Sequence, residues 1–343
     1  MRVLIVKLTS LGDLVHLFPA LTEAARARPE VEFDWAVDTS LDGIPGLHPA
    51  VAQVFGIPLR QGRRSSFMRL PGHERRALRD AFRSRAYDVV IDAQGLLKSV
   101  WVARWAGAPV AGFDWSSARE PVATLWYSRR FAVDVGLHAA DRLRHLFGRC
   151  LDYPVSEPVS PSGIEAPTVD SDGSSQRHVL LLHGSAWATK LWPEVHWRAL
   201  AEELDDRPVR LTYGNDTEAR RAERIAAGLA HVEVMPRMDF PELVALLRGA
   251  AGVVGVDSGL LHLGAAVGVP VVGLYGATDP GLTGPYGLRR DLVQSNLPCA
   301  PCRSRRCRLQ HGGPDQPGWP PCMDVLKPSE VAGRLRVQME QLA

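Results

Sequence analysis

The first stretch whose residue types could do chemistry is an eight-residue run that begins at Lys7, with the sequence Lys-Leu-Thr-Ser-Leu-Gly-Asp-Leu. It places one cation, two hydroxyls and one carboxylate between an apolar run at 3–6 and a helical pattern at 14–27. A strand that ends in such a turn and continues as a helix is typical of ligand sites at the carboxyl edge of a parallel sheet. Gly12 would let a ligand approach the backbone, and Asp13 stands where the helix begins. Asp13 is therefore either a helix N-cap or a functional carboxylate, and this stretch alone fits both interpretations.

A second stretch of this kind joins an apolar strand pattern to a helix start and reads Asp257-Ser258-Gly259-Leu260-Leu261-His262. The first backbone N–H groups of a helix lack internal partners and attract an anion, so the serine and the unhindered glycine suit a diphosphate. Lys190 follows an earlier strand of the same half and could add a point charge to those phosphates. Glu218 follows another strand and could accept a ribose hydroxyl. His262 is either part of this site or a buried, satisfied core histidine.

Basic residues are distributed unevenly. Of the 40 basic residues only four are lysines, at positions 7, 98, 190 and 327. Residues 60–85 hold nine arginines against two acids, which predicts either a solvated basic face or a site for a polyanionic acceptor or a membrane surface. Gln94, Lys98 and Ser99 follow the strong apolar strand pattern at 87–92, where either turn chemistry or ligand binding explains them.

Four of the five cysteines lie close together in the sequence, as Cys299-x2-Cys302-x4-Cys307-x14-Cys322. This spacing fits a tetrahedral structural site for zinc or iron, which would brace a loop and take no part in catalysis. Reduced thiols and disulfides stay open as alternatives, although a cytoplasmic setting disfavours disulfides. Cys150, at the end of an apparent helix, is interpreted as structural.

Several common site signatures are absent from the sequence. It contains no G-x-G-x-x-G fingerprint, no Walker A loop, no H-E-x-x-H and no G-x-S-x-G. The dinucleotide-binding, P-loop, zinc-protease and serine-hydrolase interpretations thereby lose their main support.

The elements that must position these residues repeat a strand–helix rhythm twice, which predicts an α/β chain of two Rossmann-like domains with parallel sheets facing across a cleft. A segment rich in proline, serine and glycine at 154–177 marks the boundary. We expect an acceptor-binding domain at 1–160, a donor-binding domain at 161–325, and a C-terminal helix at 326–343 that packs back on the first domain. Domain closure over the cleft is also expected.

Composition limits the classes of function. The 343 residues carry a net charge of +2, which argues against general nucleic-acid binding. No apolar run reaches the roughly 18 residues of a membrane span, and the N-terminus lacks the layout of a signal peptide. We expect a cytoplasmic protein, peripheral on the inner face of the inner membrane.

Four separate motifs, in the right order, resemble the heptosyltransferase family of GT-B glycosyltransferases. They are the run from Val6 to Asp13, Asp92-Ala93-Gln94-Gly95-Leu96-Leu97-Lys98-Ser99, the Trp115…Ala118-Arg119-Glu120-Pro121 loop, and the 257–262 run followed by Tyr275-Gly276-Ala277-Thr278-Asp279-Pro280. The second and third resemble the group of this family that acts on the Kdo of Kdo-lipid A. The cysteine segment is more similar to members with other acceptors.

The resemblance implies an inverting transfer of heptose from ADP-heptose to Kdo-lipid A, with no metal required for catalysis. Asp13 would be the catalytic base and Lys190 would assist at the diphosphate. The donor residues implied are Ser185, Lys190, Glu218, Met238, Asp257, Ser258, Gly259 and His262. The acceptor residues implied are Ser10, Gly12, Arg60, Arg63, Gln94, Lys98 and Arg119. The sequence departs from the family in two places. Ala186 follows Ser185 where the family shows a hydroxyl pair, and Gln61-Gly62 lowers the number of basic residues in the loop that contains Arg60 and Arg63.

Three other functions stay open. Members of the same family use other acceptors: a heptosylated lipopolysaccharide, Kdo phosphate or a protein serine. From another class, the chain could be a non-catalytic protein that binds nucleotide sugars, although Asp13, Lys7 and Lys190 argue against that. A Rossmann oxidoreductase is disfavoured because the glycine fingerprint is missing.

Overall fold

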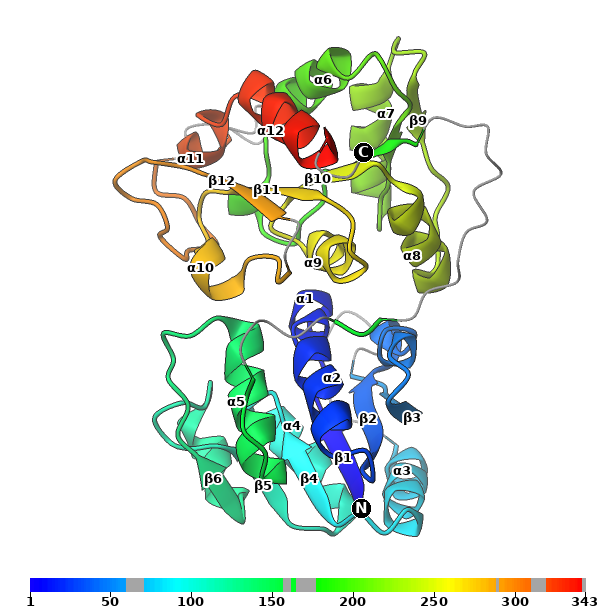
Figure 1. Cartoon of the computed structure of the whole chain (residues 1–343), viewed down its shortest axis with the longest axis vertical. Helices are drawn as coiled ribbons and strands as arrows, with labels where there is room; N and C mark the ends of the chain where they lie inside the picture. The colour runs from blue at the N-terminus through cyan, green and yellow to red at the C-terminus, as the bar shows by residue number, and fades with distance from the viewer. Residues whose placement is uncertain (60–70, 157–161, 165–176, 288–289, 310–318, 341–343) are drawn as a thin grey trace. The chain divides into compact units, whose positions relative to one another are not determined.

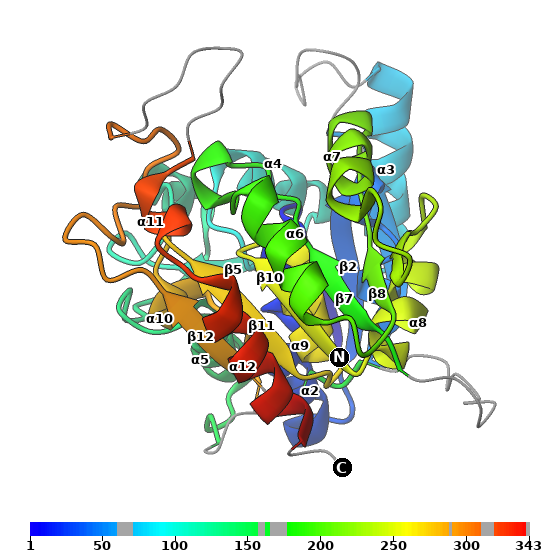
Figure 2. The same cartoon turned by 90° about the horizontal axis from the view of Figure 1, so that it is seen from above.

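The chain folds into two units in the computed structural model, Met1–Glu165 and Ala166–Ala343 (Figures 1 and 2). The structure describes residues 1–59, 71–156, 162–164, 177–287, 290–309 and 319–340. Each unit is built on its own six-stranded parallel sheet, so the predicted pair of Rossmann-like domains is confirmed at the level of the sheets. Within the described ranges, no helix has both the length and the apolar character that a membrane crossing requires.

The sheet of the first unit has the strand order β3-β2-β1-β4-β5-β6, and all neighbours run parallel. The strands are β1 Arg2–Val6, β2 Glu32–Asp38, β3 Val51–Ile57, β4 Val89–Asp92, β5 Val110–Phe113 and β6 Arg129–Phe131. The apolar run at 3–6 is fully buried because both faces of a parallel sheet are covered. The strand order reverses direction between β1 and β4, which is where open α/β sheets bind ligands beyond their carboxyl ends.

The helices of this unit are α1 Leu11–Val15, α2 Phe18–Ala27, α3 Gly72–Ser84, α4 Leu97–Ala103 and α5 Ala139–Leu151, with short 3-10 turns η1 Thr39–Leu41, η2 Pro45–Leu47, η4 Arg104–Ala106 and η5 Pro121–Trp126. The single helix expected at 14–27 was wrong in detail, because α1 ends after one turn and α2 starts anew. Pro19 occupies the first turn of α2, where its missing N–H costs nothing. The short α1 keeps its N-terminus beside the carboxyl end of β1.

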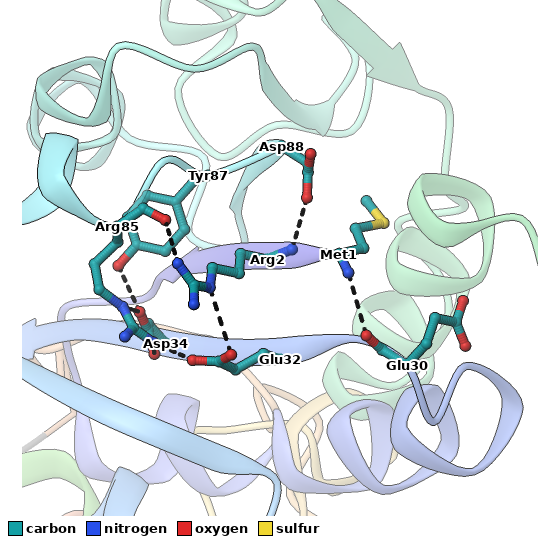
Figure 3. Close-up of polar contacts among 8 residues, drawn as sticks. All are labelled: Met1, Arg2, Glu30, Glu32, Asp34, Arg85, Tyr87 and Asp88. Carbon is teal, nitrogen blue, oxygen red and sulfur yellow. Dashed lines mark hydrogen bonds and ion pairs between the residues drawn. The ribbon is translucent and has the colours of Figure 1, made fainter.

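The amino edge of this sheet carries an ion network (Figure 3). Arg85 donates from Nε to Asp34 Oδ2 at 2.8 Å and also pairs with Glu32. Tyr87 donates its hydroxyl to the same Asp34 oxygen at 2.7 Å, and burial together with that carboxylate raises the pKa of Tyr87. Arg2 reaches Glu32 at 3.4 Å. The charges at this edge neutralise one another, which suits a structural role.

The sheet of the second unit has the order β12-β11-β10-β7-β8-β9, again all parallel. Its strands are β7 Val179–Leu182, β8 Val209–Leu211, β9 Val232–Val234, β10 Gly252–Val256, β11 Val271–Tyr275 and β12 Arg290–Gln294. Its helices are η6 Ala188–Lys190, α6 Glu194–Glu203, α7 Asp216–Ala226, α8 Phe240–Gly249, α9 Gly259–Ala266, α10 Pro280–Thr283, α11 Pro321–Asp324 and α12 Pro328–Glu340. Strand order reverses between β7 and β10, so loops after these two strands form the expected ligand edge.

The C-terminal helix α12 packs on its own unit, against α6 and strands β10 to β12. The contact is close at Gly252, where a Cβ atom would lie 2.7 Å from Leu335 Cδ1. The expected packing of this helix on the first domain stays a prediction, as do the predicted domain limits.

Candidate active site

Asp13 lies in the first turn of α1, just beyond the carboxyl end of β1. Its Oδ2 accepts hydrogen bonds from the backbone N and the Oγ of Ser10, both at 3.0 Å. The N-cap of α1 is Ser10, and Asp13 is the third residue of the helix, where it completes a capping box with Ser10. The interpretation of Asp13 as the N-cap itself was therefore wrong by three positions, although the side chain does help to cap the helix. Its Oδ1 accepts no hydrogen bond from the part of the chain that the structure describes, and the side chain is half-exposed. Capping therefore leaves one carboxylate oxygen available to a ligand.

Lys7 is buried beneath this turn, and its Nζ donates to the backbone oxygen of Ala93 at 2.9 Å. Burial lowers the pKa of Lys7, while the nearby carboxylates of Asp13 and Asp92 oppose that shift and Arg119 adds to it. The sequence left the partner of Lys7 open. In the structure this partner is the backbone oxygen of Ala93, and the Asp13 carboxylate lies close enough to affect the pKa of Lys7.

Gln94 and Lys98 hold the segment that leads into α1. Gln94 Oε1 accepts from the backbone N of Leu8 at 2.6 Å, and Gln94 Nε2 donates to the backbone oxygen of Thr9 at 2.9 Å. Lys98 Nζ donates to Thr9 Oγ1 at 3.1 Å. Two residues predicted to bind an acceptor therefore fix the backbone next to Ser10.

Asp92 fixes the backbone of Gln94 through a hydrogen bond. Its Oδ1 accepts from the backbone N of Gln94 at 3.0 Å, and its Oδ2 accepts from Ser99 Oγ at 2.9 Å and the Tyr127 hydroxyl at 2.7 Å. Burial raises the pKa of Asp92, although these hydrogen bonds oppose the shift. Sequence analysis assigned no role to Tyr127, because its link to Asp92 depends on tertiary contact alone.

Arg119 is exposed and follows the carboxyl end of β5. Its backbone passes close to Gly95, where a Cβ atom would lie 3.3 Å from Arg119 N and where φ is +69°. Glycine is required there because a side chain would be strained as well as crowded. The structure thus brings Arg119 beside the Gln94 segment, whereas Arg60 and Arg63 lie outside the described residues.

In the second unit, Asp257 directly follows β10 and contacts two basic side chains. Lys190 Nζ lies 2.7 Å from Asp257 Oδ2, and His262 Nε2 lies 3.3 Å from Asp257 Oδ1. Burial favours the neutral acid, but the contacts with His262 and Lys190 outweigh it and hold the pKa of Asp257 well below its usual range. The prediction left open whether His262 is a core histidine; it is buried, and it contacts a predicted site residue.

Ser185 and Glu218 lie around the loop that follows β7. Ser185 Oγ donates to the backbone oxygen of Asp257 at 3.3 Å. Glu218, in the first turn of α7, accepts from the backbone N of Gly214 at 2.8 Å and covers Gly184, where a Cβ atom would lie 2.9 Å from its Cδ. Met238 is half-buried in the loop between β9 and α8.

Three hydroxyl oxygens near this edge are buried and have no hydrogen-bond partner among the described residues: Ser258 Oγ, Thr278 Oγ1 and the Tyr275 hydroxyl. Ser258 directly precedes α9, and Gly259 is the first residue of that helix. An unpaired buried hydroxyl is costly, so such groups commonly mark places where a ligand completes the hydrogen bonding. Sequence analysis assigned roles to Ser258 and Gly259 but not to Thr278 or Tyr275, although both belong to a motif that it quoted.

Trp187 connects Lys190 to the cysteine-rich segment. Lys190 Nζ lies 4.6 Å from the centre of the Trp187 ring, and Arg305 Cζ lies 4.8 Å from it. Thr189 Oγ1 donates to the backbone oxygen of Ser304 at 2.8 Å. The loop that carries Lys190 is therefore held by the loop that carries the cysteines.

The four clustered cysteines line one small cavity of about 20 Å³ in the second unit. They are Cys299, Cys302, Cys307 and Cys322. Burial, together with the other three thiols, raises the pKa of Cys322 to about 11. All five cysteines are free thiols, and no set of three or more His, Cys, Asp or Glu side chains in the described residues is arranged closely enough to hold a metal ion. The sequence spacing predicted that the four thiols lie together. In the structure they line the same cavity but do not have the geometry of metal ligands.

Comparison with known proteins identifies the family of this chain. The model of glycosyltransferase family 9 (heptosyltransferase) matches residues 75–312. The chain is 43% identical to lipopolysaccharide heptosyltransferase 1 of Pseudomonas aeruginosa, over 99% of this chain and 98% of that protein. The chain belongs to glycosyltransferase family 9, the heptosyltransferases.

Further relatives support membership of this family. Lipopolysaccharide heptosyltransferase 1 of Escherichia coli is 42% identical over 84% of this chain and 91% of that protein. The solved structure of E. coli heptosyltransferase WaaC with ADP superposes with a TM-score of 0.79 at 40% identity, covering 85% of this chain and 93% of that one. The predicted GT-B fold, glycosyltransferase activity and heptosyltransferase family are confirmed.

Proposed function

We propose that this heptosyltransferase transfers L-glycero-D-manno-heptose from ADP-heptose to the Kdo of Kdo-lipid A, with inversion at the anomeric carbon. The observation that carries the proposal is the Asp257 cluster, in which an ionised carboxylate contacts Lys190 and His262. The neighbouring Ser258 hydroxyl has no hydrogen-bond partner among the described residues. Such a cluster suits the diphosphate of a nucleotide sugar. The E. coli relative was solved with ADP and with ADP-2-deoxy-2-fluoro heptose, which supports the choice of donor.

The donor would bind through charge and helix-terminal amides. Lys190 carries three N–H donors, so it can keep Asp257 and still bind a phosphate oxygen. Ser258 Oγ and the first amides of α9 would complete the diphosphate contacts. Glu218 and Met238 would take the ribose and adenine end, and Ser185 would add one hydroxyl.

The chemical step needs one base. Asp13 Oδ1 would accept the proton of an acceptor hydroxyl as that oxygen forms a bond to the anomeric carbon of the donor. The bond between this carbon and the diphosphate oxygen breaks, and ADP leaves with the electron pair. Lys190 and the α9 amides would stabilise the charge that develops on ADP without a metal. A single displacement of this kind inverts the anomeric centre and needs no covalent intermediate.

The acceptor would be held by the first unit. Kdo carries a carboxylate and lipid A carries phosphates, so cations must meet them. Lys98 and Arg119 are the described candidates, and Arg60 and Arg63 are predicted to join them. Ser10, Gly12 and Gln94 would shape the turn around the attacking hydroxyl. A cytoplasmic protein, peripheral on the inner leaflet of the inner membrane, would meet this acceptor.

The test is a transfer assay with ADP-heptose against Kdo-lipid A, Kdo phosphate and a heptosylated acceptor. Turnover with Kdo-lipid A at least about tenfold above the others is expected. Preference for the heptosylated acceptor would instead support the alternative member of the family. A thermal-shift panel of ADP, UDP, GDP and NADH checks the donor separately, since only ADP should stabilise the protein. Stabilisation by NADH alone would overturn the proposal.

We further propose that the four clustered cysteines bind a structural zinc or iron ion. Four thiols line one cavity, and four thiolates are a ligand set that zinc and iron accept, so metal binding would require the cysteine side chains to move together. Metal binding would hold the ligands as thiolates and order the loop at 299–307, which contacts Thr189 and Trp187. The site would brace the donor loop and take no part in the chemistry.

Elemental analysis of the purified protein tests this proposal. One zinc or iron per chain is expected, and Cys302→Ser should remove it and lower the melting temperature. Cys150→Ser, a buried cysteine outside the cluster, should leave the metal content unchanged. A wild-type protein that holds no zinc or iron after anaerobic purification and reconstitution would overturn it.

A further inference from the structure

One part of the first unit exposes large apolar side chains. Among the described residues, six of the eleven exposed large hydrophobic side chains fall between Leu97 and Val135. Two of the six are tryptophans, Trp115 at 56% and Trp126 at 42% exposure, and Leu125 is 60% exposed. Scattered exposed residues are normal, but a local group that includes tryptophans commonly marks an interaction surface.

The group follows from the geometry of η5 and α4. A 3-10 helix repeats every three residues, so Val122 and Leu125 point to the same side of η5, while Ala123 and Thr124 between them are buried. Helix α4 packs beside η5. The backbone N of Leu97 donates to Glu120 Oε2 at 2.7 Å, which ties the start of α4 to the residue before η5.

We call this surface the α4–η5 face, made of Leu97, Val122, Leu125 and Trp126. Three exposed arginines, Arg104, Arg119 and Arg130, and one exposed acid, Glu120, lie next to α4 and η5 in the chain, so the border of the face is net basic. Arg104 follows α4, and Arg119 lies two residues before η5. Arg130 donates from Nε to the backbone oxygen of Thr124 at 2.8 Å, which fixes its stem along η5. The face therefore combines apolar and aromatic side chains with a basic border.

We propose that the α4–η5 face docks the protein on an anionic lipid bilayer. Trp126, Leu125 and Val122 would enter the interfacial layer, where amphipathic tryptophan rings are favoured. The bordering arginines would meet lipid phosphates. The inference rests on the proposed function in one respect, since Kdo-lipid A is anchored in a bilayer and Lys98 and Arg119 adjoin this face.

The basic border also disfavours a second copy of the chain as the partner that covers this face. A symmetric dimer through this face would bring the arginines of both copies together, and like charges across an interface oppose association. An anionic surface matches the same border. Charge complementarity therefore favours the bilayer.

Sedimentation with lipid vesicles tests the proposal on the full chain without any sugar substrate. Wild-type protein should bind vesicles of phosphatidylglycerol and phosphatidylethanolamine more tightly than vesicles of phosphatidylcholine. The double variant Leu125→Ser/Trp126→Ser should weaken binding to the anionic vesicles at least about tenfold, since both side chains lose their apolar contact. Val195→Ser, an exposed apolar residue on α6 of the second unit, is the matched control and should bind like the wild type.

A second variant keeps the test valid if the first one folds poorly. Arg104→Gln/Arg130→Gln should weaken binding to anionic vesicles and remove much of its salt dependence, while binding to phosphatidylcholine stays unchanged. Failure of the wild type to bind either kind of vesicle would overturn the proposal. So would equal binding by wild type and Leu125→Ser/Trp126→Ser, or a wild-type dimer that this variant converts to monomer.

A transfer assay separates this inference from the proposed function. The Leu125→Ser/Trp126→Ser variant should lose turnover with bilayer-embedded acceptor but keep it with a fully deacylated, water-soluble acceptor. If no acceptor is glycosylated while vesicle binding still depends on the face, the proposed acceptor fails and the docking surface stands. If both acceptors are used equally by the variant, the docking surface fails and the proposed function stands.

Discussion

The carboxyl edges of the two sheets both carry an aspartate beside a lysine, yet the two aspartates are held differently. Asp257 is buried and contacts Lys190 and His262 through both of its oxygens. Asp13 is half-exposed, and within the described part of the chain it accepts hydrogen bonds at one oxygen only, both from Ser10. Its lysine neighbour, Lys7, donates instead to the backbone oxygen of Ala93.

This difference suits the two aspartates to two different chemical roles, anchoring cations and accepting a proton. A carboxylate whose pKa is held far below its usual range is a poor proton acceptor but a good anchor for cations. A carboxylate with one unoccupied oxygen can receive a proton from a substrate. The difference therefore supports the proposed roles, an anion site in the second unit and a catalytic base in the first.

The largest effect is expected for Asp13→Asn. The amide can still accept a hydrogen bond from Ser10, so the helix cap is kept, but it cannot take a proton. Turnover should fall by on the order of a thousandfold, the usual contribution of a general base. ADP affinity, measured by calorimetry, should stay within about twofold because the proposed donor site lies in the other unit.

Asp80→Asn, an exposed acid on α3, serves as the control and should change neither quantity. An Asp13→Asn enzyme that turns over at more than a tenth of the wild-type rate would remove Asp13 from the proposed role. A large loss of ADP affinity would show that the two aspartates do not divide the work as argued.

Asp257→Asn should produce the next largest effect, and on different quantities. Removing the carboxylate leaves Lys190 without its ion pair in a largely buried position, which typically costs about 3–5 kcal/mol. The free energy of unfolding, from urea titration, should fall accordingly, and ADP affinity should drop at least about tenfold because Lys190 is no longer positioned. Asp291→Asn, which breaks a partly exposed pair with Arg334, should cost at most about 1 kcal/mol and leave ADP binding intact.

Much of this division could be predicted from the sequence. Apolar runs followed by small and polar residues located the carboxyl edges, because such patterns depend on local chain geometry. The run from Lys7 and the run from Asp257 were both found this way. The resemblance to a family then supplied roles that spacing alone left open, such as the base for Asp13.

Contacts between distant segments could not be predicted. Tyr127 reaches Asp92, and Arg305 reaches Trp187, across intervals that carry no periodic signal. The break between α1 and α2 was missed because the apolar spacing continues through it, and Pro19 marks the start of a new helix as readily as a kink. The surface made by α4 and η5 was missed for a similar reason, since exposure depends on which neighbours cover a helix.

Gln94→Ala should have a moderate effect that is confined to the first unit. It removes the hydrogen bonds that hold Leu8 and Thr9, so the turn that presents Asp13 loosens. The rate constant kcat should fall about tenfold to a hundredfold, as small misplacements of a catalytic group do. The KM for the donor should not change, and Gln94→Glu, which keeps one acceptor oxygen for Leu8, should recover part of the loss.

Gln53→Ala, on an exposed position of β3, is the matched control for kcat. If Gln94→Ala raised the donor KM and left kcat unchanged, the hydrogen bonds from Gln94 to Leu8 and Thr9 would serve donor binding and not the positioning of the base.

The smallest effect, and the sharpest contrast, is expected from two serines whose hydroxyl oxygens are buried. Ser99 Oγ is hydrogen-bonded to Asp92, so Ser99→Ala should lower the free energy of unfolding by about 1–3 kcal/mol. Ser258 Oγ is buried and has no partner in the ranges that the structure describes, so Ser258→Ala should leave stability unchanged or raise it slightly, while ADP affinity falls severalfold. Urea titration and calorimetry on both variants measure the two quantities. Loss of stability in Ser258→Ala without loss of ADP affinity would mean that this hydroxyl serves the fold, and the second unit would then lack the unpaired donor that its anion site requires.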